Sequence, residues 1–478
     1  MNGTRRFLIR TGAVVIGLAA AVYLFHVLVV HFSMLESPKI QTPSLELRSV
    51  GPTLRYYGAS YVSEADGIIE ARLEGTAAEI GWASGKLLRE DILETEGRLF
   101  KQFEHYVPRA WARALLLDWA RIRYSHLDQN LDANSREELA GLGAALEPDP
   151  FTSFMPAYQR LVYLSGLYDI SLSFERAPLV GCTTFLVRGA SGDGGHSWLA
   201  RNFDFEVDDI FDQRKILYLM VESETIPFAS VAWPGVPGVV SGMNAEGLAL
   251  VVHGGRAGSF DVSGEPVLQT MRYVLGHARS TADALEILRH KRPMVSHIVI
   301  ATDPSAQSMV IERVPRQSPY VYRVPERAVI TNHFIGPATD DPQNLRVREE
   351  TTTLYRQQRG QQILARYKRP LKASDFTDLL RERRGINDAD LPLGDRRSIG
   401  ALIAAHGVVF DTTERKLWVS TPPHLLGRFI EFDLKLLLAQ RPDPDTTLTK
   451  RRFLPADPLY VSGQYDEWKK TQPKSAHP

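Results

Sequence analysis

Two short stretches decide the fold prediction: Gly181-Cys182-Thr183-Thr184-Phe185 and, about twenty residues later, Ala200-Arg201-Asn202-Phe203-Asp204-Phe205. Both have the β-branched and aromatic composition of strands, and Asp193-Gly194-Gly195 between them is a turn signal. Two antiparallel strands joined at this turn would bring Arg201 and Asp204 back beside the cysteine. The sequence therefore predicts a pair of strands with a thiol at the start of the first.

Cys182 is the single cysteine among 478 residues, which excludes an intramolecular disulfide and a cysteine-based metal cluster. A thiol becomes a nucleophile when neighbouring groups stabilise its thiolate, as Arg201 could do here. Asp204 could orient an amine at the same place. Two structural alternatives stay open at this point: a buried, inert thiol, and an Arg201–Asp204 ion pair that only stabilises the fold.

These residues resemble the penicillin acyltransferase family (acyl-coenzyme A:6-aminopenicillanic acid acyltransferases) of cysteine N-terminal-nucleophile (Ntn) hydrolases. They are similar, more widely, to bile salt hydrolases, penicillin V acylases and acid ceramidase. Such proteins begin their mature catalytic chain with Cys-Thr and carry Arg-Asn-x-Asp on the next strand. Three further segments of the chain resemble motifs of the group: Ser241–Leu248, Thr331–Phe334 and Leu73–Gly85.

The resemblance implies a self-cleaving enzyme. The thiol of Cys182 attacks the carbonyl of Gly181, the chain breaks, and the two fragments stay associated. Cys182 then carries a free α-amine, whose ordinary pKa of about 7.7–8.0 suits a general base near neutral pH. Nucleophile and base are thereby combined in one residue.

Two further roles follow from the resemblance. Asn332 would donate to the oxyanion of the tetrahedral intermediate, although an asparagine there could also cap a turn. Arg397, or its neighbour Arg396, corresponds to an active-site arginine. One departure concerns the second oxyanion asparagine of bile salt hydrolases, because this chain has His253-Gly254-Gly255 at that place, and the second donor could be a backbone N–H.

The fold implied is α+β, an Ntn αββα sandwich of two sheets between helical layers. Residues 75–145 have a helical pattern, and short β-type runs begin near Gly181. The expected organisation along the chain is a signal anchor at 1–32, a linker at 33–55, a helical propeptide at 56–181, the catalytic domain at 182–440 and a tail at 441–478.

The N-terminus predicts a transmembrane helix. Ala13 to Val30 is almost continuously apolar, which is long enough to cross a bilayer. Arginines precede the apolar run and no basic residue follows it before Lys39, so the positive-inside rule places the body outside the cytoplasm, in a periplasmic or extracellular location. The arginines are Arg5, Arg6 and Arg10.

Composition narrows the functional classes. The chain has 56 Lys and Arg residues and 56 Asp and Glu residues, so its net charge creates no overall electrostatic attraction to nucleic acid. Zinc and dinucleotide motifs are absent from the sequence, and no cofactor or metal is expected. We therefore expect a membrane-anchored cysteine amidohydrolase or acyltransferase that acts on linear amides. The alternatives are a lipid N-acyl amidase similar to acid ceramidase, and an inactive Ntn fold that serves as a binding protein.

Overall fold

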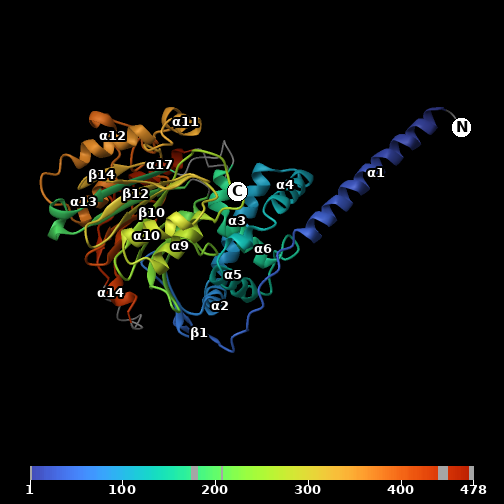
Figure 1. Cartoon of the computed structure of the whole chain (residues 1–478), viewed down its shortest axis with the longest axis horizontal. Coiled ribbons are helices and arrows are strands. Elements are labelled where there is room, and N and C mark those ends of the chain that lie inside the picture. The colour runs from blue at the N-terminus through green and yellow to red at the C-terminus, as the bar shows by residue number, and fades with distance from the viewer. Residues whose placement is uncertain (1–2, 174–180, 206–207, 440–450, 473–478) are drawn as a thin grey trace.

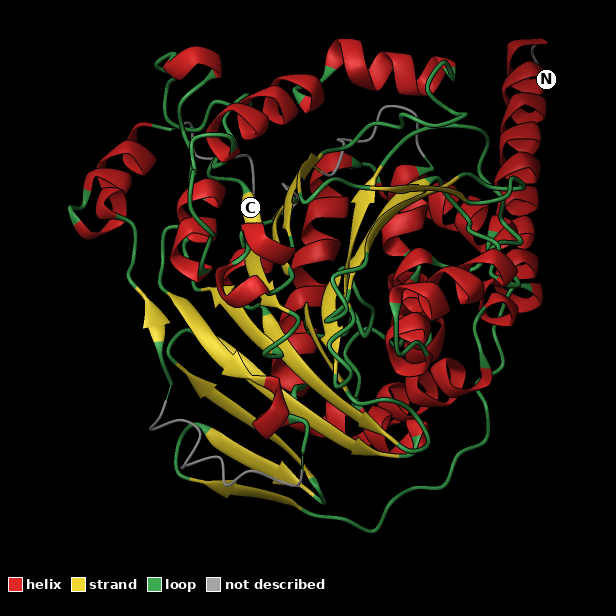
Figure 2. Ribbon diagram, turned by 60° about the vertical axis from the view of Figure 1, so that its left-hand side comes forward, coloured by secondary structure: helices red, strands yellow, loops and turns green. Residues whose placement is uncertain are grey.

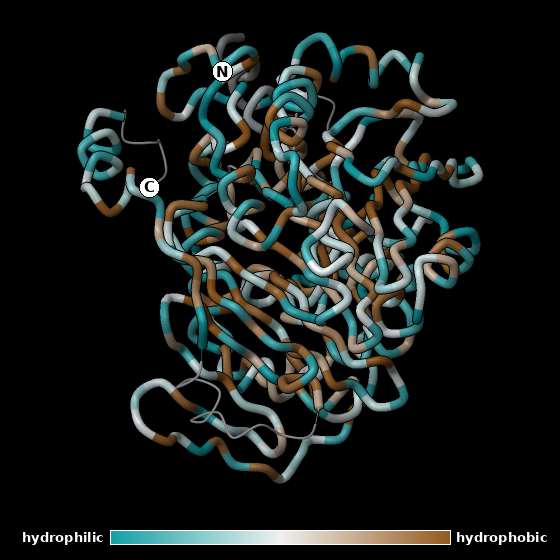
Figure 3. The backbone as a smooth tube through the Cα atoms, turned by 90° about the vertical axis from the view of Figure 1, so that its left-hand side faces the viewer, coloured by the Kyte–Doolittle hydropathy of each residue, from teal (hydrophilic) through white to brown (hydrophobic). Residues whose placement is uncertain are grey.

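The structure is a computed structural model that describes residues 3–173, 181–205, 208–439 and 451–472. Two β-sheets, of 11 and 7 strands, form its centre, and helices lie on their outer sides (Figure 2). The hydrophobic stretches of the chain run mostly along these central strands, whereas the outer loops are mainly hydrophilic (Figure 3). The expected α+β class with two sheets is thereby confirmed.

The larger sheet has the order β1-β2-β3-β4-β7-β8-β9-β10-β11-β12-β13. Its pairs are antiparallel except for β4 and β7, which run parallel. The strands are β1 (Leu47–Val50), β2 (Leu54–Tyr57), β3 (Ser60–Ala65), β4 (Ile68–Gly75), β7 (Ile216–Glu222), β8 (Phe228–Ala232), β9 (Ser241–Asn244), β10 (Ala249–Gly254), β11 (His297–Thr302), β12 (Ser308–Arg313) and β13 (Tyr320–Arg323).

The smaller sheet is antiparallel throughout and has the order β14-β5-β6-β15-β16-β17-β18. The two strands predicted around the cysteine lie near its centre. The strands are β14 (Arg327–Ile330), β5 (Gly181–Val187), β6 (Trp198–Asp204), β15 (Ala404–Asp411), β16 (Lys416–Ser420), β17 (Phe429–Asp433) and β18 (Phe453–Leu454).

Helices occupy the outer faces and the connections. The longer ones are α1 (Gly3–Phe32), α2 (Ala77–Leu87), α3 (Arg89–Tyr106), α4 (Ala110–Arg123), α5 (Ala133–Ala145), α6 (Ala157–Ser165), α9 (Val267–His277), α10 (Thr281–His290), α11 (Pro342–Glu350), α12 (Thr353–Leu364), α13 (Ala373–Leu380) and α17 (Gln464–Thr471). The shorter ones are α7 (Leu167–Leu172), α8 (Ile210–Gln213), α14 (Leu434–Leu437) and α16 (Pro458–Val461).

The helices and sheets stack in four layers, in the order helix, sheet, sheet, helix, and clusters of buried side chains fill the spaces between them. Alternation along β5 shows the principle, because successive residues of a strand point to opposite faces. Leu186 belongs to the cluster between the two sheets, together with Leu219 of β7 and Val251 of β10. Phe185 and Val187 belong to the cluster that packs against α12 and α13. A third cluster joins the larger sheet to α2, α5, α6 and α9.

The N-terminal part differs from the expected linker and all-helical propeptide. Residues 47–75 form four strands, and β4 extends the larger sheet by pairing in parallel with β7. Six successive residues of β4, 68–73, are buried, the charged Glu70 and Arg72 among them, so both faces of this strand are covered. The first helix of the body, α2, begins only after Thr76, whose side chain forms a capping box with Glu79.

The C-terminal part also differs from the expected surface tail. β18 pairs with β17, and α16 and α17 pack onto the body. Leu459 and Tyr465 of these two helices are buried against Leu402 and Leu426. The last thirty residues are rich in Pro, Lys and Asp, and this polar composition predicted a surface tail. The few apolar residues among them, Leu459 and Tyr465, pack against the body nonetheless.

Helix α1 projects away from the body (Figure 1). Its segment Arg10–Phe32 has 23 residues and is almost entirely exposed in the structure. It is long and apolar enough to cross a membrane. Length and composition alone carry this statement, and signal sequences and buried core helices share both properties. It is the one helix of this kind in the described residues.

Candidate active site

The predicted pair of strands forms as expected. β5 and β6 are antiparallel, with Gly181 opposite Asp204 and Cys182 opposite Phe203. The connection between them contains Gly194 and Gly195, whose φ angles of 64° and 76° suit glycine. Because opposite residues of an antiparallel pair share a face, the thiol and the Asp204 carboxylate lie on opposite faces of the sheet.

Arg201 contacts the thiol directly. Its Nη2 donates to Cys182 Sγ at 3.2 Å and to the carbonyl oxygen of Val252 at 2.7 Å. Its Nη1 donates to the carbonyl oxygen of Val240 at 3.1 Å and to the hydroxyl of Ser241. Arg201 is completely buried, so these neighbours hold its guanidinium in one position against the sulfur.

Asn332 and a second arginine hold the backbone of Cys182. The N–H of Cys182 donates to Asn332 Oδ1 at 2.7 Å. Arg356 of α12 donates through Nη1 to the carbonyl oxygen of Cys182 at 2.6 Å and through Nη2 to Asn332 Oδ1 at 3.0 Å. Asn332 Nδ2 in turn donates to the carbonyl oxygen of Gly254 at 2.9 Å. The Asn332 amide thus sits beside the nitrogen that self-cleavage would free.

Asp204 lies against the glycine of the expected cleavage site. A Cβ added at Gly181 would come within 3.0 Å of Asp204 Oδ2 and 3.1 Å of Asp204 Cβ, which explains why glycine fits here. Burial raises the pKa of Asp204 to about 6, against the opposing charges of Arg356, Arg201 and Arg396. This carboxyl can therefore gain or lose a proton near neutral pH.

Burial also raises the pKa of the Cys182 thiol, and the attraction of Arg201 and Arg356 only partly opposes this effect. In the intact chain the thiol is fully buried and stays protonated near neutral pH. Tyr168 of α7, in the segment before Gly181, is buried close to it, and burial followed by the Cys182 charge raises the Tyr168 pKa well above its ordinary value. The residues before the expected cut thus help to close the site.

His253 links the strand of the thiol to the segment of Asn332. One ring nitrogen, Nε2, lies 2.7 Å from Thr184 Oγ1, and the other, Nδ1, lies 3.0 Å from the carbonyl oxygen of Thr331. Burial first, then the charges of Arg201 and Arg356, hold the His253 pKa well below its ordinary value, so the ring is neutral. His253 therefore acts as a neutral spacer between β5 and the 331–333 segment.

Arg397 lies outside this cluster, contrary to expectation. It is half-exposed and forms an ion pair with Asp395, with Nη2 2.6 Å from Oδ2. Its neighbour Arg396 is nearer to the site, since its charge lowers the pKa of Asp204. The second arginine that contacts Cys182, besides Arg201, is Arg356, which the sequence did not single out. Its signal is helical spacing: Thr353, Arg356, Gly360 and Ile363 lie on one buried face of α12.

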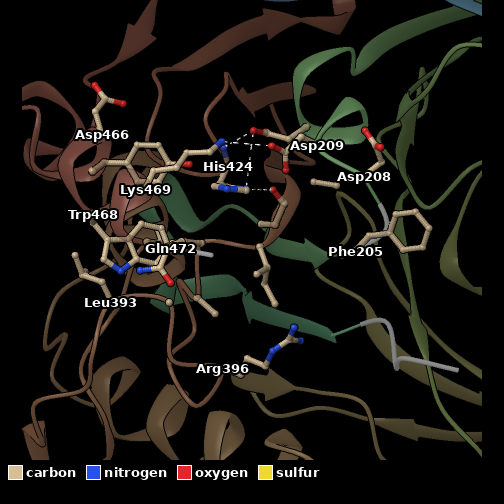
Figure 4. A pocket seen from close by; sticks show the side chains of 18 of the residues that line it. Phe205, Asp208, Asp209, Leu393, Arg396, His424, Asp466, Trp468, Lys469 and Gln472 are labelled. Carbon is tan, nitrogen blue, oxygen red and sulfur yellow. Dashed lines mark hydrogen bonds and ion pairs between the residues drawn. The ribbon is translucent and has the colours of Figure 1, made fainter. Parts of the chain in front are cut away.

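A cavity of about 1100 Å³ opens at the end of β6 (Figure 4). Phe205, directly after Asp204, lines it together with Arg396 and with Ala404, the β15 residue opposite Asp204. Trp468 of α17 also lines the cavity. Lys469 of the same helix forms an ion pair with Asp209, with 3.3 Å between Nζ and Oδ2. The cavity is large enough for a drug-sized ligand.

Two stacked sheets lie between helical layers, and Cys182 lies near the start of an inner strand of the smaller sheet. Residues 190–420, just under half of the chain, match the model of the acyl-coenzyme A:6-aminopenicillanic acid acyl-transferase family. The resemblance drawn from the sequence is thereby confirmed. The match includes Arg201, Asp204, Asn332 and Arg356, and it begins eight residues after Cys182.

Three solved enzyme structures align with about half of the chain. A Caenorhabditis elegans ortholog of N-acylethanolamine-hydrolyzing acid amidase covers 48% of this chain and 93% of its own, at 15% identity and a TM-score of 0.35. A mutant conjugated bile acid hydrolase from Clostridium perfringens covers 53% and 92%, at 14% identity and a TM-score of 0.36. Penicillin V acylase from Agrobacterium tumefaciens covers 53% and 92%, at 15% identity and a TM-score of 0.31. Because these TM-scores lie below 0.5, the assignment rests on the family match. No curated protein sequence matches the chain.

Proposed function

We propose that this protein is a self-processing cysteine Ntn hydrolase, which cuts its own Gly181–Cys182 bond and then attacks linear amide bonds with Cys182. One observation carries the proposal: three side chains converge on Cys182, each at a different atom. Arg201 contacts its sulfur, Asn332 its nitrogen and Arg356 its carbonyl oxygen. An inert structural thiol would not require such an arrangement.

Self-cleavage would proceed through an acyl shift. The Cys182 sulfur loses its proton and attacks the Gly181 carbonyl carbon, and the carbon–nitrogen bond then breaks with proton transfer to the Cys182 nitrogen. Water hydrolyses the resulting thioester, which leaves a Gly181 carboxylate, a free thiol and a free α-amine. Asp204 packs against Gly181 with a pKa of about 6, on the face of the sheet opposite the thiol, so it would assist proton transfer at the Gly181–Cys182 peptide bond and not at the sulfur.

Turnover would then use the new α-amine. This amine lies where the Cys182 N–H now donates to Asn332 Oδ1, so Asn332 would keep it oriented toward the thiol. The amine takes the thiol proton, the sulfur attacks the substrate carbonyl, and the departing amine receives the proton. Hydrolysis of the acyl-thioester by water, or its transfer to an amine acceptor, frees Cys182. Asn332 Nδ2 would serve as an oxyanion donor.

The cavity beside Asp204 would hold one side of the substrate. Its lining includes the apolar and aromatic side chains of Phe205, Leu393 and Trp468. This lining favours an amide with an apolar group, and it keeps a lipid N-acyl amidase as the second candidate. Charged side chains also line the cavity, basic ones such as Arg396 and Lys469 and acidic ones such as Asp212, and they would favour a polar or charged group at the other end of the substrate.

We further propose that α1 anchors the protein in a membrane with its body outside the cytoplasm. The apolar segment Arg10–Phe32 supports the anchor, and the arginines before it support the orientation. Mass analysis of the purified full chain tests the central proposal, because cleavage before Cys182 yields two fragments of defined mass. An uncleaved protein without amidase activity would instead favour a binding protein.

A further inference from the structure

Helix α4 exposes a broad apolar face. Five of its large apolar side chains are exposed by 43% or more: Trp111, Leu115, Leu116, Trp119 and Ile122. Four of them, at positions 111, 115, 119 and 122, repeat at the spacing of one helix face. Asp118 and Arg121 of the same helix are buried, exposed by 2% and 6%, and Leu117 and Ala120 are partly buried beside them. α4 thus buries two charged side chains and leaves most of its large apolar side chains exposed.

The charges around this face are basic. Asp118 is the one acidic residue within α4, and it is buried. Arg109 precedes the helix, and Arg123 is its last residue, with its guanidinium over the Trp119 ring at 5.4 Å from the centroid. Arg113, within the helix, pairs with Glu104 at 3.3 Å. A helix with tryptophan and leucine on one side and arginine along its edge is typical of helices that lie in a membrane interface. Arg109 and Arg123 would face anionic headgroups.

The apolar face of α4 continues the apolar surface of α1. His26 of α1 bonds through Nδ1 to Asp118 Oδ2 at 2.8 Å, and Arg121 Nη1 lies 3.2 Å from Asp118 Oδ1. The two helices lie side by side where α1 meets the body (Figure 1). The carbonyl oxygen of Ser33, just beyond α1, accepts from Gln159 Nε2 at 2.9 Å, so the body begins here.

The depth of this contact matches the edge of a bilayer. At about 1.5 Å per residue, the segment from Arg10 to Phe32 spans about 34 Å, against a hydrocarbon core of about 30 Å. His26 lies six residues before Phe32, or about 9 Å from the body end of that segment. Because α4 contacts α1 at His26, α4 lies beside the last turns of the membrane-spanning segment.

We propose that α4 is a second membrane contact, which inserts its apolar face into the interface of the same bilayer that α1 crosses. The ligand of this surface is a lipid bilayer with anionic headgroups. The inference rests on the proposed anchoring and is independent of the catalytic proposal. A lone anchor helix leaves the body free to tilt, whereas two contacts fix its orientation toward the lipid surface.

Tryptophan quenching by brominated lipid tests this inference on the full chain. The protein is placed in vesicles of phosphatidylcholine and phosphatidylglycerol, with and without dibrominated acyl chains. α1 contains no tryptophan. Trp111 and Trp119 of α4 are the exposed tryptophans of the described residues, so their fluorescence should be the part that the brominated lipid quenches. The Trp111→Phe/Trp119→Phe variant should lose most of the quenching. Trp468→Phe, in the cavity wall, should retain it. Equal quenching in the two variants would overturn the proposal.

Spin labels distinguish lipid from a protein partner. A nitroxide at Leu115→Cys is compared with one at Leu354→Cys, an exposed position on α12, while Cys182 is fully buried. The label on α4 should collide with oxygen in the bilayer and be shielded from a water-soluble nickel complex, and the label on α12 should behave in the opposite way. Aqueous exposure at position 115, or broadening between labels of two copies, would refute the lipid contact. Neither measurement depends on cleavage or turnover.

Discussion

Arg356 Nη1 donates to the carbonyl oxygen of Cys182 at 2.6 Å, although 174 residues separate the two in the sequence. The same nitrogen donates to Thr183 Oγ1 at 2.8 Å, and Nη2 reaches Asn332. One buried guanidinium thus connects Cys182 and Thr183 of β5 to the Asn332 amide, which holds the Cys182 nitrogen. Arg397, the arginine expected from the sequence, pairs instead with Asp395 at the surface.

Replacing Arg356 should therefore impair the chemistry, and replacing Arg397 should not. Arg356→Gln removes a charge-assisted hydrogen bond to Cys182 and leaves its carbonyl oxygen with a weaker partner. We expect kcat to fall by about 10²-fold, by analogy with the loss of one buried polar group at an active site. Arg397→Gln is the matched control and should retain wild-type activity. Equal losses in the two variants would contradict the assignment.

Self-cleavage should yield fragments of residues 1–181 and 182–478 that remain associated. Sequencing of the second fragment should begin Cys-Thr-Thr-Phe. Cys182→Ala should abolish both cleavage and amide turnover because it removes the attacking atom, whereas Cys182→Ser should cleave slowly. An intact wild-type chain with amidase activity would refute self-processing.

Asn332→Ala should lower kcat by about 10²–10³, with less effect on KM, as the loss of an oxyanion donor does. Asn244→Ala is the matched control, because Asn244 is equally buried and bonds only to its own hairpin and to Leu275 and Ala278. That variant should lower the melting temperature and leave kcat near wild type. A change confined to KM in Asn332→Ala would make this residue a binding group.

The raised pKa of Asp204 predicts a pH-dependent stability of the uncleaved chain. Its carboxyl holds a proton more tightly in the folded state, with a pKa of about 6 against an ordinary 3.8. The stability contributed by this group should therefore fall as pH rises from about 4 to about 6. In a Cys182→Ala background, Asp204→Asn should gain up to about 3 kcal/mol relative to its parent across this window. Urea unfolding in detergent measures the difference, and a flat difference would exclude the raised pKa.

The proposed orientation predicts which side of the membrane carries the body. External protease should digest the segment after Glu36 in intact spheroplasts, since arginines precede the apolar run and would stay in the cytoplasm. A cytoplasmic marker protein in the same sample must remain protected. Protection of the body would show that the topology is inverted.

The sequence determined the local features of the molecule. The antiparallel pairing around Cys182 follows from two β-type runs and a glycine turn between them, and the structure contains this pair. The register, with Gly181 opposite Asp204, is a finding of the structure. The apolar helix at the N-terminus follows from composition over a single window. Such features depend on neighbours along the chain, so local periodicity is sufficient to predict them.

Only the tertiary structure decided which distant residues meet. The parallel pairing of β4 with β7, the packing of α17 onto the cavity and the contact of Arg356 with Cys182 join segments far apart in the chain. Arg356 and Arg397 are equivalent as letters in a sequence, and both stand in polar surroundings. They differ because α12 packs its Thr353–Ile363 face onto β5 and β14, which buries one guanidinium against the thiol strand and leaves the other in solvent. Which of the two arginines is buried depends on how the layers stack, and no local sequence pattern predicts it.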